Sequence, residues 1–166
     1  MARRVLHDEF FRKAKAEGYL ARSAYKLKEL QDRKKLIQRG DLVLDLGCAP
    51  GSWLQVASEL TGESGVVVGI DLKPINRSIA PNVRTVVGDI TAFDPKELVE
   101  LAGGPFDVVV SDMAPNTSGA GDSERSVSLC YDVLAILRHV LRPSGNLAMK
   151  EGPRGRALQG PARRHR

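Results

Sequence analysis

Residues 45–53 read Asp-Leu-Gly-Cys-Ala-Pro-Gly-Ser-Trp and directly follow the apolar run Leu-Val-Leu at 42–44. This order predicts a buried strand over 42–46, then a tight glycine turn, then a helix that begins near Ser52. In an open α/β sheet, such a junction is where a nucleotide-like ligand binds. Gly47 and Gly51 let the backbone turn sharply, and they let a ligand approach where a Cβ would collide.

The same turn is poorly suited to holding a pyrophosphate. It does not read Gly-x-Gly-x-x-Gly, because its two glycines are four positions apart. A phosphate cradle needs free backbone N–H donors at the start of the helix, and Pro50 removes one of them. The pattern therefore favours a ligand without phosphates, and S-adenosylmethionine is the first candidate for the cofactor.

Strand-like and helix-like segments alternate along the chain. Runs rich in Val, Leu and Ile predict strands at 42–46, 66–70, 83–87, 106–111 and 145–149. Helices are predicted at 8–17, 23–33, 52–61, 95–102 and 126–141, with Ser23 as the N-cap of the second helix. Apolar strands that alternate with helices are typical of a Rossmann-like, doubly wound, mostly parallel α/β sheet.

Composition restricts the class of protein. A chain of 166 residues with 42% hydrophobic residues is expected to form one soluble domain. Its apolar runs are far shorter than the roughly 20 residues that span a bilayer, and its N-terminus does not resemble a secretory signal. Cys48 and Cys130 lack metal-ligand spacing. We therefore expect a cytoplasmic protein without a membrane anchor or a metal site.

Charge divides the chain into three parts. Residues 1–39 hold 12 Lys and Arg against 5 Asp and Glu, residues 40–151 hold 8 against 15, and residues 152–166 hold five Arg and no acid. We interpret these parts as a basic helical RNA-binding segment, a Rossmann-like core and a disordered basic tail. Phe10, Phe11, Tyr19 and Tyr25 lie among the basic residues and are candidates for stacking on bases. The alternative for residues 1–39 is an ordinary solvated, charged helix.

Four charged residues follow predicted strands. Asp71, Asp89, Asp112 and Lys150 end the second, third, fourth and fifth strands. The carboxyl ends of parallel strands meet at one crevice, so these side chains are expected to converge there. A carboxylate at the position of Asp71 is expected to accept hydrogen bonds from ribose hydroxyls, and one at Asp89 from an adenine amino group. Trp53 is either a core residue or a lining residue of the pocket, and the sequence leaves both open.

Several motifs occur in a specific order: Asp-Leu-Gly-Cys-Ala-Pro-Gly-Ser-Trp at 45–53, Ile-Asp-Leu-Lys-Pro at 70–74, Gly-Asp-Ile-Thr at 88–91 and Ser-Asp-Met-Ala-Pro-Asn-Thr-Ser-Gly at 111–119. Together with Arg-Ser-Ala-Tyr-Lys-Leu-Lys-Glu-Leu at 22–30, they resemble the FtsJ/RrmJ (RlmE) family of ribosomal RNA 2′-O-methyltransferases. The resemblance covers about residues 7–150. It implies a methyltransferase that takes S-adenosylmethionine as donor and a uridine ribose 2′-hydroxyl of large-subunit ribosomal RNA as acceptor. The implied partner is the large ribosomal subunit, and we expect a monomer.

The resemblance also implies roles for individual residues. The cofactor-binding positions of the family match Gly51, Trp53, Asp71, Asp89 and Asp112, to which the glycine turn itself adds Gly47. A Lys-Asp-Lys-Glu tetrad serves catalysis in that family. Its first three members match Lys26, Asp112 and Lys150, with the second lysine as the proton acceptor. A lysine is a base only when neutral, so its pKa would have to fall from about 10.4.

The chain departs from the family after Lys150. The tetrad glutamate should come from a later strand, whereas Glu151 is adjacent to Lys150 and would point to the other face of a strand. We therefore expect the C-terminal strands to be missing and one sheet edge to be exposed. Three hypotheses remain: an RNA 2′-O-methyltransferase, a non-catalytic cofactor- or RNA-binding remnant, and a small-molecule methyltransferase or nicotinamide enzyme. The Pro50 turn and the basic N-terminal segment argue against the third.

Overall fold

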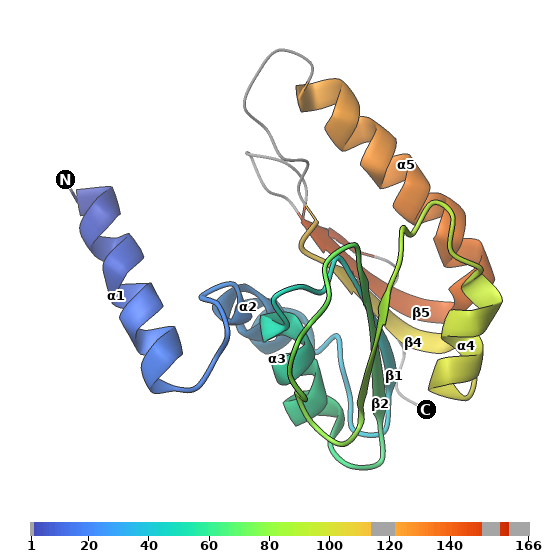
Figure 1. Ribbon diagram of the computed structural model, residues 1–166, viewed down its shortest axis with the longest axis horizontal. Helices are drawn as coiled ribbons and strands as arrows, with labels where there is room; N and C mark the ends of the chain where they lie inside the picture. The colour runs from blue at the N-terminus through green and yellow to red at the C-terminus, as the bar shows by residue number, and fades with distance from the viewer. Residues whose placement is uncertain (1, 114–121, 151–156, 160–166) are drawn as a thin grey trace.

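A computed structural model describes residues 2–113, 122–150 and 157–159. Its elements form a six-stranded sheet with helices on both faces (Figure 1). The strands are β1 (Leu42–Leu46), β2 (Val66–Asp71), β3 (Val83–Val87), β4 (Phe106–Ser111), β5 (Leu141–Lys150) and β6 (Ala157–Gln159). The helices are α1 (Ala2–Ala16), α2 (Ala24–Lys34), α3 (Ser52–Thr61), α4 (Pro95–Ala102) and α5 (Asp122–Val140).

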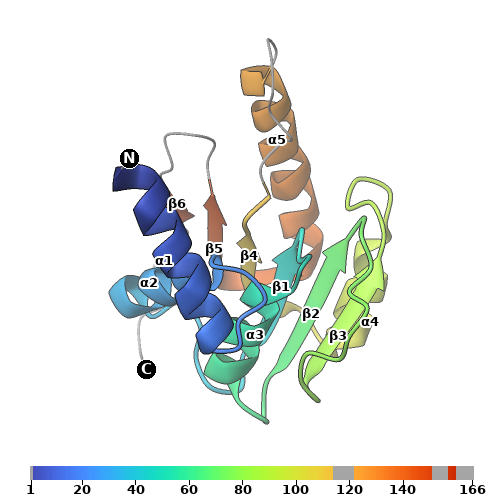
Figure 2. The same ribbon diagram turned by 60° about the vertical axis from the view of Figure 1, so that its left-hand side comes forward.

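The sheet has the order β3-β2-β1-β4-β5-β6, as Figure 2 shows. Strands β1 to β5 pair in parallel, and β6 pairs antiparallel with β5. The chain moves outward from β1 to β3 on one side and then from β4 outward on the other. The predicted doubly wound, mostly parallel sheet is therefore confirmed, and its direction of winding changes between β1 and β4. Ligands bind beside such a switch point.

The central strands β1, β2 and β4 are buried on both faces, which explains their nearly continuous apolar sequences. Val43 of β1 belongs to a core cluster shared with α2 and α3. Leu44 and Leu46 of the same strand belong to the opposite cluster, which includes residues of α4 and α5. Alternate side chains of one strand thus fill two cores, because successive residues point to opposite faces.

Strands β1 and β3, and helices α3 and α4, have the bounds that the sequence predicts. Helix α1 begins at Ala2 rather than at residue 8, and α5 covers Asp122–Val140 rather than 126–141. The largest difference is β5, which begins at Leu141 rather than at residue 145. Its pairing with β4 steps from Phe106–Leu141 to Val108–Asn146, so that extra residues of β5 bulge out. The Pro-Ser-Gly stretch at 143–145 therefore lies inside a strand, and Ser144 has a φ of 63°.

The expectation of disorder over 152–166 is wrong for residues 157–159. These residues form β6, which pairs with residues 148–150 of β5. Pairing of this kind uses backbone groups, which every residue carries whatever its side chain. The sheet edge that we expected to be exposed is therefore covered along this short stretch of β5. The other residues of the expected tail lie outside the described part of the chain.

None of the helices in the described part of the chain is both long and apolar enough to cross a membrane. The N-terminal segment packs on the body of the protein through α2, whose Ala24 and Leu27 are buried in the same core as β1. Helix α1 extends away from the sheet, as Figure 1 shows.

A seam between α2 and α3 holds the N-terminal segment in place. The indole Nε1 of Trp53 donates a 2.8 Å hydrogen bond to the carbonyl oxygen of Ser23, and Trp53 is 4% exposed. The Ser23 and Ser52 hydroxyl oxygens are 2.7 Å apart. Helix α2 begins after Ser23 as predicted, but this side chain makes no capping hydrogen bond because it faces α3 instead.

The seam predicts the effect of Trp53→Phe on stability. Phenylalanine removes the indole donor, so the Ser23 carbonyl keeps only the N–H of Lys26, at 3.0 Å, and the smaller ring leaves space in the core. The free energy of unfolding should therefore fall by about 1–3 kcal/mol. Urea unfolding followed by far-ultraviolet circular dichroism measures this change. The exposed Tyr131→Phe is the control and should change stability by less than about 0.5 kcal/mol. A Trp53→Phe protein as stable as the parent would contradict this account of the seam.

Candidate functional site

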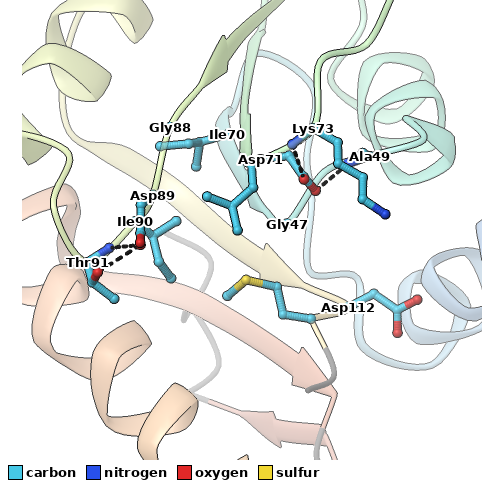
Figure 3. A pocket seen from close by; sticks show the side chains of 12 residues that line it. Gly47, Ala49, Ile70, Asp71, Lys73, Gly88, Asp89, Ile90, Thr91 and Asp112 are labelled. Carbon is cyan, nitrogen blue, oxygen red and sulfur yellow. Dashed lines mark hydrogen bonds between the residues drawn. The ribbon is translucent and has the colours of Figure 1, made fainter. Parts of the chain in front are cut away.

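A cavity of about 390 Å³ opens at the carboxyl ends of β1 to β4 (Figure 3). This volume lies within the range of small-molecule sites. Each strand contributes lining residues just after it ends: Gly47 and Ala49 after β1, Asp71–Lys73 at and after β2, residues 88–91 after β3, and Asp112 and Met113 after β4. The cavity is therefore assembled by the switch in strand order, as the sequence predicts.

The glycine turn uses its backbone donors within the protein. The N–H groups of Gly47 and Cys48 both donate to the carbonyl oxygen of Ile70, at 2.9 and 3.2 Å. The N–H of Ala49 donates to Oδ2 of Asp71 at 2.9 Å, and Pro50 has no N–H. These four consecutive residues thus offer no free donor to a phosphate, which strengthens the expectation drawn from Pro50 alone.

Two carboxylates at the cavity are held in fixed positions by backbone donors (Figure 3). Oδ1 of Asp71 accepts from the N–H of Lys73 at 2.8 Å, in addition to the bond from Ala49 to Oδ2. Oδ1 of Asp89 accepts from the N–H of Thr91 at 2.9 Å and from its hydroxyl at 2.8 Å. These bonds to Thr91 lower the pKa of Asp89, because they favour the charged carboxylate.

The structure brings together two of the three residues expected to be catalytic. Nζ of Lys26, on α2, lies 3.4 Å from Oδ1 of Asp112, which follows β4. The two residues are 86 positions apart in the chain. Helix α2 therefore delivers a cation from the basic N-terminal segment to the mouth of the cavity.

The third expected catalytic residue, Lys150, is the last residue of β5. Ser111 of β4 pairs with Met149 of β5, so Asp112 and Lys150 are the next residues on two neighbouring strands. The side chain of Lys150 lies outside the described part of the structure.

Two residues expected at the cofactor do not line the cavity. Trp53 is a core residue of the α2–α3 side, so the structure favours the core alternative that the sequence left open. Gly51 precedes α3 with a φ of 110°, a conformation that suits glycine. A Cβ on Gly51 would lie 3.0 Å from Cδ1 of Ile79 and 3.2 Å from Cδ1 of Leu20. Gly51 therefore serves close packing beside the turn.

The sequence analysis missed Asp45, which is the acid nearest to the glycine turn in the chain. Its side chain is 1% exposed, and its Oδ2 has no hydrogen-bond partner among the described residues. Burial raises its pKa well above the ordinary value, and the nearby charges of Asp112 and Asp71 add to the effect. The available signal was an acid inside the otherwise apolar run 42–46.

Met113 was also missed, although it lines the cavity next to Asp112. A Cβ at Gly47 would overlap its side chain. The glycine is therefore needed both for its φ of 76° and for the room that Met113 takes.

Cys48 is buried, and burial raises the pKa of its thiol, with Asp45 and Asp71 adding to the effect. A buried, protonated thiol is a weak nucleophile, so Cys48 is a packing residue of the turn.

The aromatic residues expected to stack on bases mostly contact one another. The ring of Tyr25 lies 6.0 Å from that of Phe10 and 5.9 Å from that of Tyr19, measured between centroids. The Tyr25 hydroxyl donates to Glu17, and Lys13 lies 5.1 Å from the centre of the Tyr25 ring. Phe11 differs, because 61% of it is exposed.

Comparison with known proteins identifies the family. The chain matches the FtsJ-like methyltransferases over residues 19–157. It belongs to this family. A relative from Syntrophobacter fumaroxidans is 48% identical over 148 residues, which cover 88% of this chain and 75% of the relative. Another, from Desulfatibacillum aliphaticivorans, is 47% identical, with 86% and 70% covered. Both are named ribosomal RNA large subunit methyltransferase E.

Solved structures agree with this assignment. A Plasmodium falciparum protein assigned as a ribosomal RNA methyltransferase superposes with a TM-score of 0.71 and 28% identity, over 80% of this chain and 78% of that one. Fibrillarin from Aeropyrum pernix, crystallised with natively bound S-adenosyl-L-methionine, shares the fold with a TM-score of 0.53 and 23% identity, over 69% of this chain and 46% of its own. The predicted methyltransferase fold is thereby confirmed, and membership of the FtsJ-like methyltransferases supports the expected cofactor, S-adenosylmethionine.

The residues of the cavity fit this cofactor. Asp71, Asp89 and Asp112 give the cavity a negative lining, with no phosphate-binding donors from residues 47–50. S-adenosylmethionine carries a cationic sulfonium and an ammonium group, and it has ribose hydroxyls and an adenine amino group that donate to carboxylates. When bound, the cofactor supplies an electrophilic methyl group.

The Asp71 bonds predict a binding defect for Asp71→Asn. An amide replaces one acceptor oxygen by a donor, so one backbone bond to the glycine turn or to Lys73 is lost together with a charge. Loss of a hydrogen bond to a charged group costs about 1.5–3 kcal/mol, so the Kd for S-adenosylmethionine should rise at least about tenfold. Isothermal titration calorimetry measures it. Glu63→Gln, which removes an exposed charge outside this cavity, should leave the Kd unchanged.

The buried Asp45 predicts a pH-dependent gain in stability for Asp45→Asn. The pKa of Asp45 is raised in the folded state, so this state binds more protons than the unfolded state, whose pKa is about 3.9. The free energy of unfolding of the parent should therefore fall as the pH rises from about 4 towards the raised pKa.

Asparagine cannot ionise and should escape this loss, so the advantage of Asp45→Asn should grow across the same interval. Urea unfolding at pH 4, 5, 6 and 7 measures it. A difference in stability that does not vary with pH would contradict the assignment of a raised pKa to Asp45.

Proposed function

We propose that this chain transfers a methyl group from S-adenosylmethionine to the ribose 2′-hydroxyl of a uridine in large-subunit ribosomal RNA, with Lys150 as the general base. The observation that carries the proposal is the meeting of Lys26 and Asp112, 3.4 Å apart, at the cavity of a methyltransferase. The register of β4 and β5 supports Lys150 as the third member, because it follows Met149, the partner of Ser111.

The acceptor class rests on the relatives and on charge. Relatives that are 47–48% identical are named ribosomal RNA large subunit methyltransferase E. Residues 1–39 are strongly basic, and exposed cations of α1 such as Lys15 lie on the segment that also delivers Lys26. Such a surface favours an anionic partner such as RNA. We further propose that the protein acts as a monomer in the cytoplasm.

Methyl transfer to a ribose hydroxyl has two requirements that the protein must meet. The ribose oxygen must lie in line with the methyl carbon and the sulfur, which is a matter of positioning. The hydroxyl must also lose its proton, for which a base is needed. In this proposal Lys26 and the cationic donor make the charged form of Lys150 unfavourable, so that it accepts the proton, while Asp112 orients the two lysines and partly opposes that shift.

A second candidate function is a non-catalytic remnant of the family that binds the cofactor or RNA. The observation that favours it concerns the fourth tetrad member. None of the residues that line the cavity is a glutamate, and Glu151 lies outside the described part of the chain. The first candidate needs only a positioned hydroxyl and a base, so it does not depend on this glutamate.

The two candidate functions differ in whether the protein transfers a methyl group. Purified protein is titrated with S-adenosylmethionine in the calorimeter and then incubated with tritium-labelled donor and hypomethylated large ribosomal subunits. Labelled ribose at a uridine supports the enzyme. Binding without transfer supports the remnant. A folded protein that does not bind the donor would contradict both the enzyme and a cofactor-binding remnant.

Lys150→Ala separates catalysis from binding. Removing a general base should reduce the rate of transfer by about 10²–10⁴-fold, whereas the Kd for S-adenosylmethionine should stay within about threefold because the proposed base acts on the acceptor. Single-turnover transfer and calorimetry measure the two quantities. Lys96→Ala, at an exposed position of α4, is the control and should retain the parental rate. Transfer by Lys150→Ala at that rate would show that another group takes the proton.

A further inference from the structure

The buried carboxyl of Asp45 has no evident structural purpose. It lies within β1, whose other residues are apolar, two positions before Gly47, and it is 1% exposed. Its Oδ2 has no hydrogen-bond partner among the described residues. A buried polar group without a partner costs stability, and a buried charge without a partner costs more. Such a cost is typical of a group retained for function.

The groups around Asp45 make its ionisation depend on what the cavity holds. Asp71 at the end of β2 and Asp112 after β4 both act electrostatically on Asp45, and both line the cavity. Cys48 in the turn is buried and experiences the field of Asp45, and its own thiol is held protonated. Two cations lie at the cavity: Lys26 of α2, which is bound to Asp112, and Lys73, which lines it. Within the described part of the chain, Asp45 forms no ion pair with either of them, whereas two carboxylates act on it.

The two cofactor forms differ by one charge. S-adenosylmethionine has a sulfonium, an ammonium and a carboxylate, and is a net monocation. The product, S-adenosylhomocysteine, has lost the sulfonium charge and is net neutral. A cation bound near Asp71 and Asp112 lowers the free-energy cost of ionising Asp45. A neutral ligand that excludes water does not lower this cost.

We propose that Asp45 distinguishes the cationic methyl donor from the neutral product by releasing its proton to solvent when the donor binds. The balanced step takes an uncharged carboxyl and the monocationic donor to a carboxylate–donor complex and one proton in the buffer. After transfer the sulfonium charge is gone and Asp45 regains a proton, which leaves the product complex without the attraction that held the donor. Asp45 is thus a specificity-determining residue that acts by charge.

This inference rests on the cofactor part of the proposed function and not on the acceptor or on Lys150. It is tested on the full chain without RNA. Calorimetric titrations with S-adenosylmethionine and S-adenosylhomocysteine are run between pH 5 and 6.5 in buffers of different ionisation enthalpy, which gives the number of protons released per ligand bound. The sulfonium lowers the pKa of the donor's ammonium. In this pH interval, however, both ligands carry a protonated ammonium and an ionised carboxylate, so these groups add no difference.

We expect the donor to release more protons than the product, by up to one. Over that pH interval the affinity for the donor should rise by up to about tenfold per pH unit, while the affinity for the product stays nearly constant. In Asp45→Asn the difference in proton release should vanish. The matched control is Asp41→Asn, because Asp41 is also buried but precedes β1, at the opposite end of the strand from the cavity. It should keep the parental difference.

If the parental protein releases equal numbers of protons with the two ligands, the inference is overturned. This result does not require that Asp45→Asn folds. Persistence of the difference in a folded Asp45→Asn would overturn it as well. Neither result affects the proposed function, since the donor still binds. A protein that binds no donor contradicts the proposed function first and the inference with it.

Discussion

The candidate site depends on the way the glycine turn is tied to the end of β2. The backbone donors of Gly47 and Cys48 meet the carbonyl of Ile70, and that of Ala49 meets the carboxylate of Asp71. The end of β2 thus accepts the hydrogen bonds of three consecutive N–H groups of the turn, which fixes the mouth of the cavity to the centre of the sheet. Because these donors are used internally, the turn selects against phosphate and leaves the carboxylates as the groups that a ligand meets.

Those carboxylates repel one another, and the structure compensates only in part. Asp71 and Asp89 are stabilised by backbone donors, and Asp112 is paired with Lys26. Oδ2 of Asp45 has no hydrogen-bond partner among the described residues. A concentration of negative charge of this kind is unfavourable in the empty protein and becomes favourable when a cation occupies the cavity. The same arrangement explains why the cationic donor, rather than a dinucleotide, suits a fold that both classes of ligand use.

Most of the fold could be predicted from the sequence, because strands buried on both faces must be apolar throughout. The strand-end acids could be predicted for the related reason that parallel strands end at one edge. The N-terminal boundary of β5 could not, because the bulge at Ser144 arises from pairing with β4 rather than from local composition. The place of Trp53 was undecidable, since its partner is a carbonyl 30 residues away. Asp45 was missed because an acid in an apolar strand is meaningful only when its surroundings are known.

The seam between α2 and α3 has a practical consequence. Trp53 is the one tryptophan of the chain, and it is buried where the helix that carries Lys26 meets the helix that follows the glycine turn. The protein therefore contains a built-in optical reporter at the junction between its basic segment and its cofactor loop. Its emission should respond to any motion that parts these two helices, without a dye and without interference from a second indole.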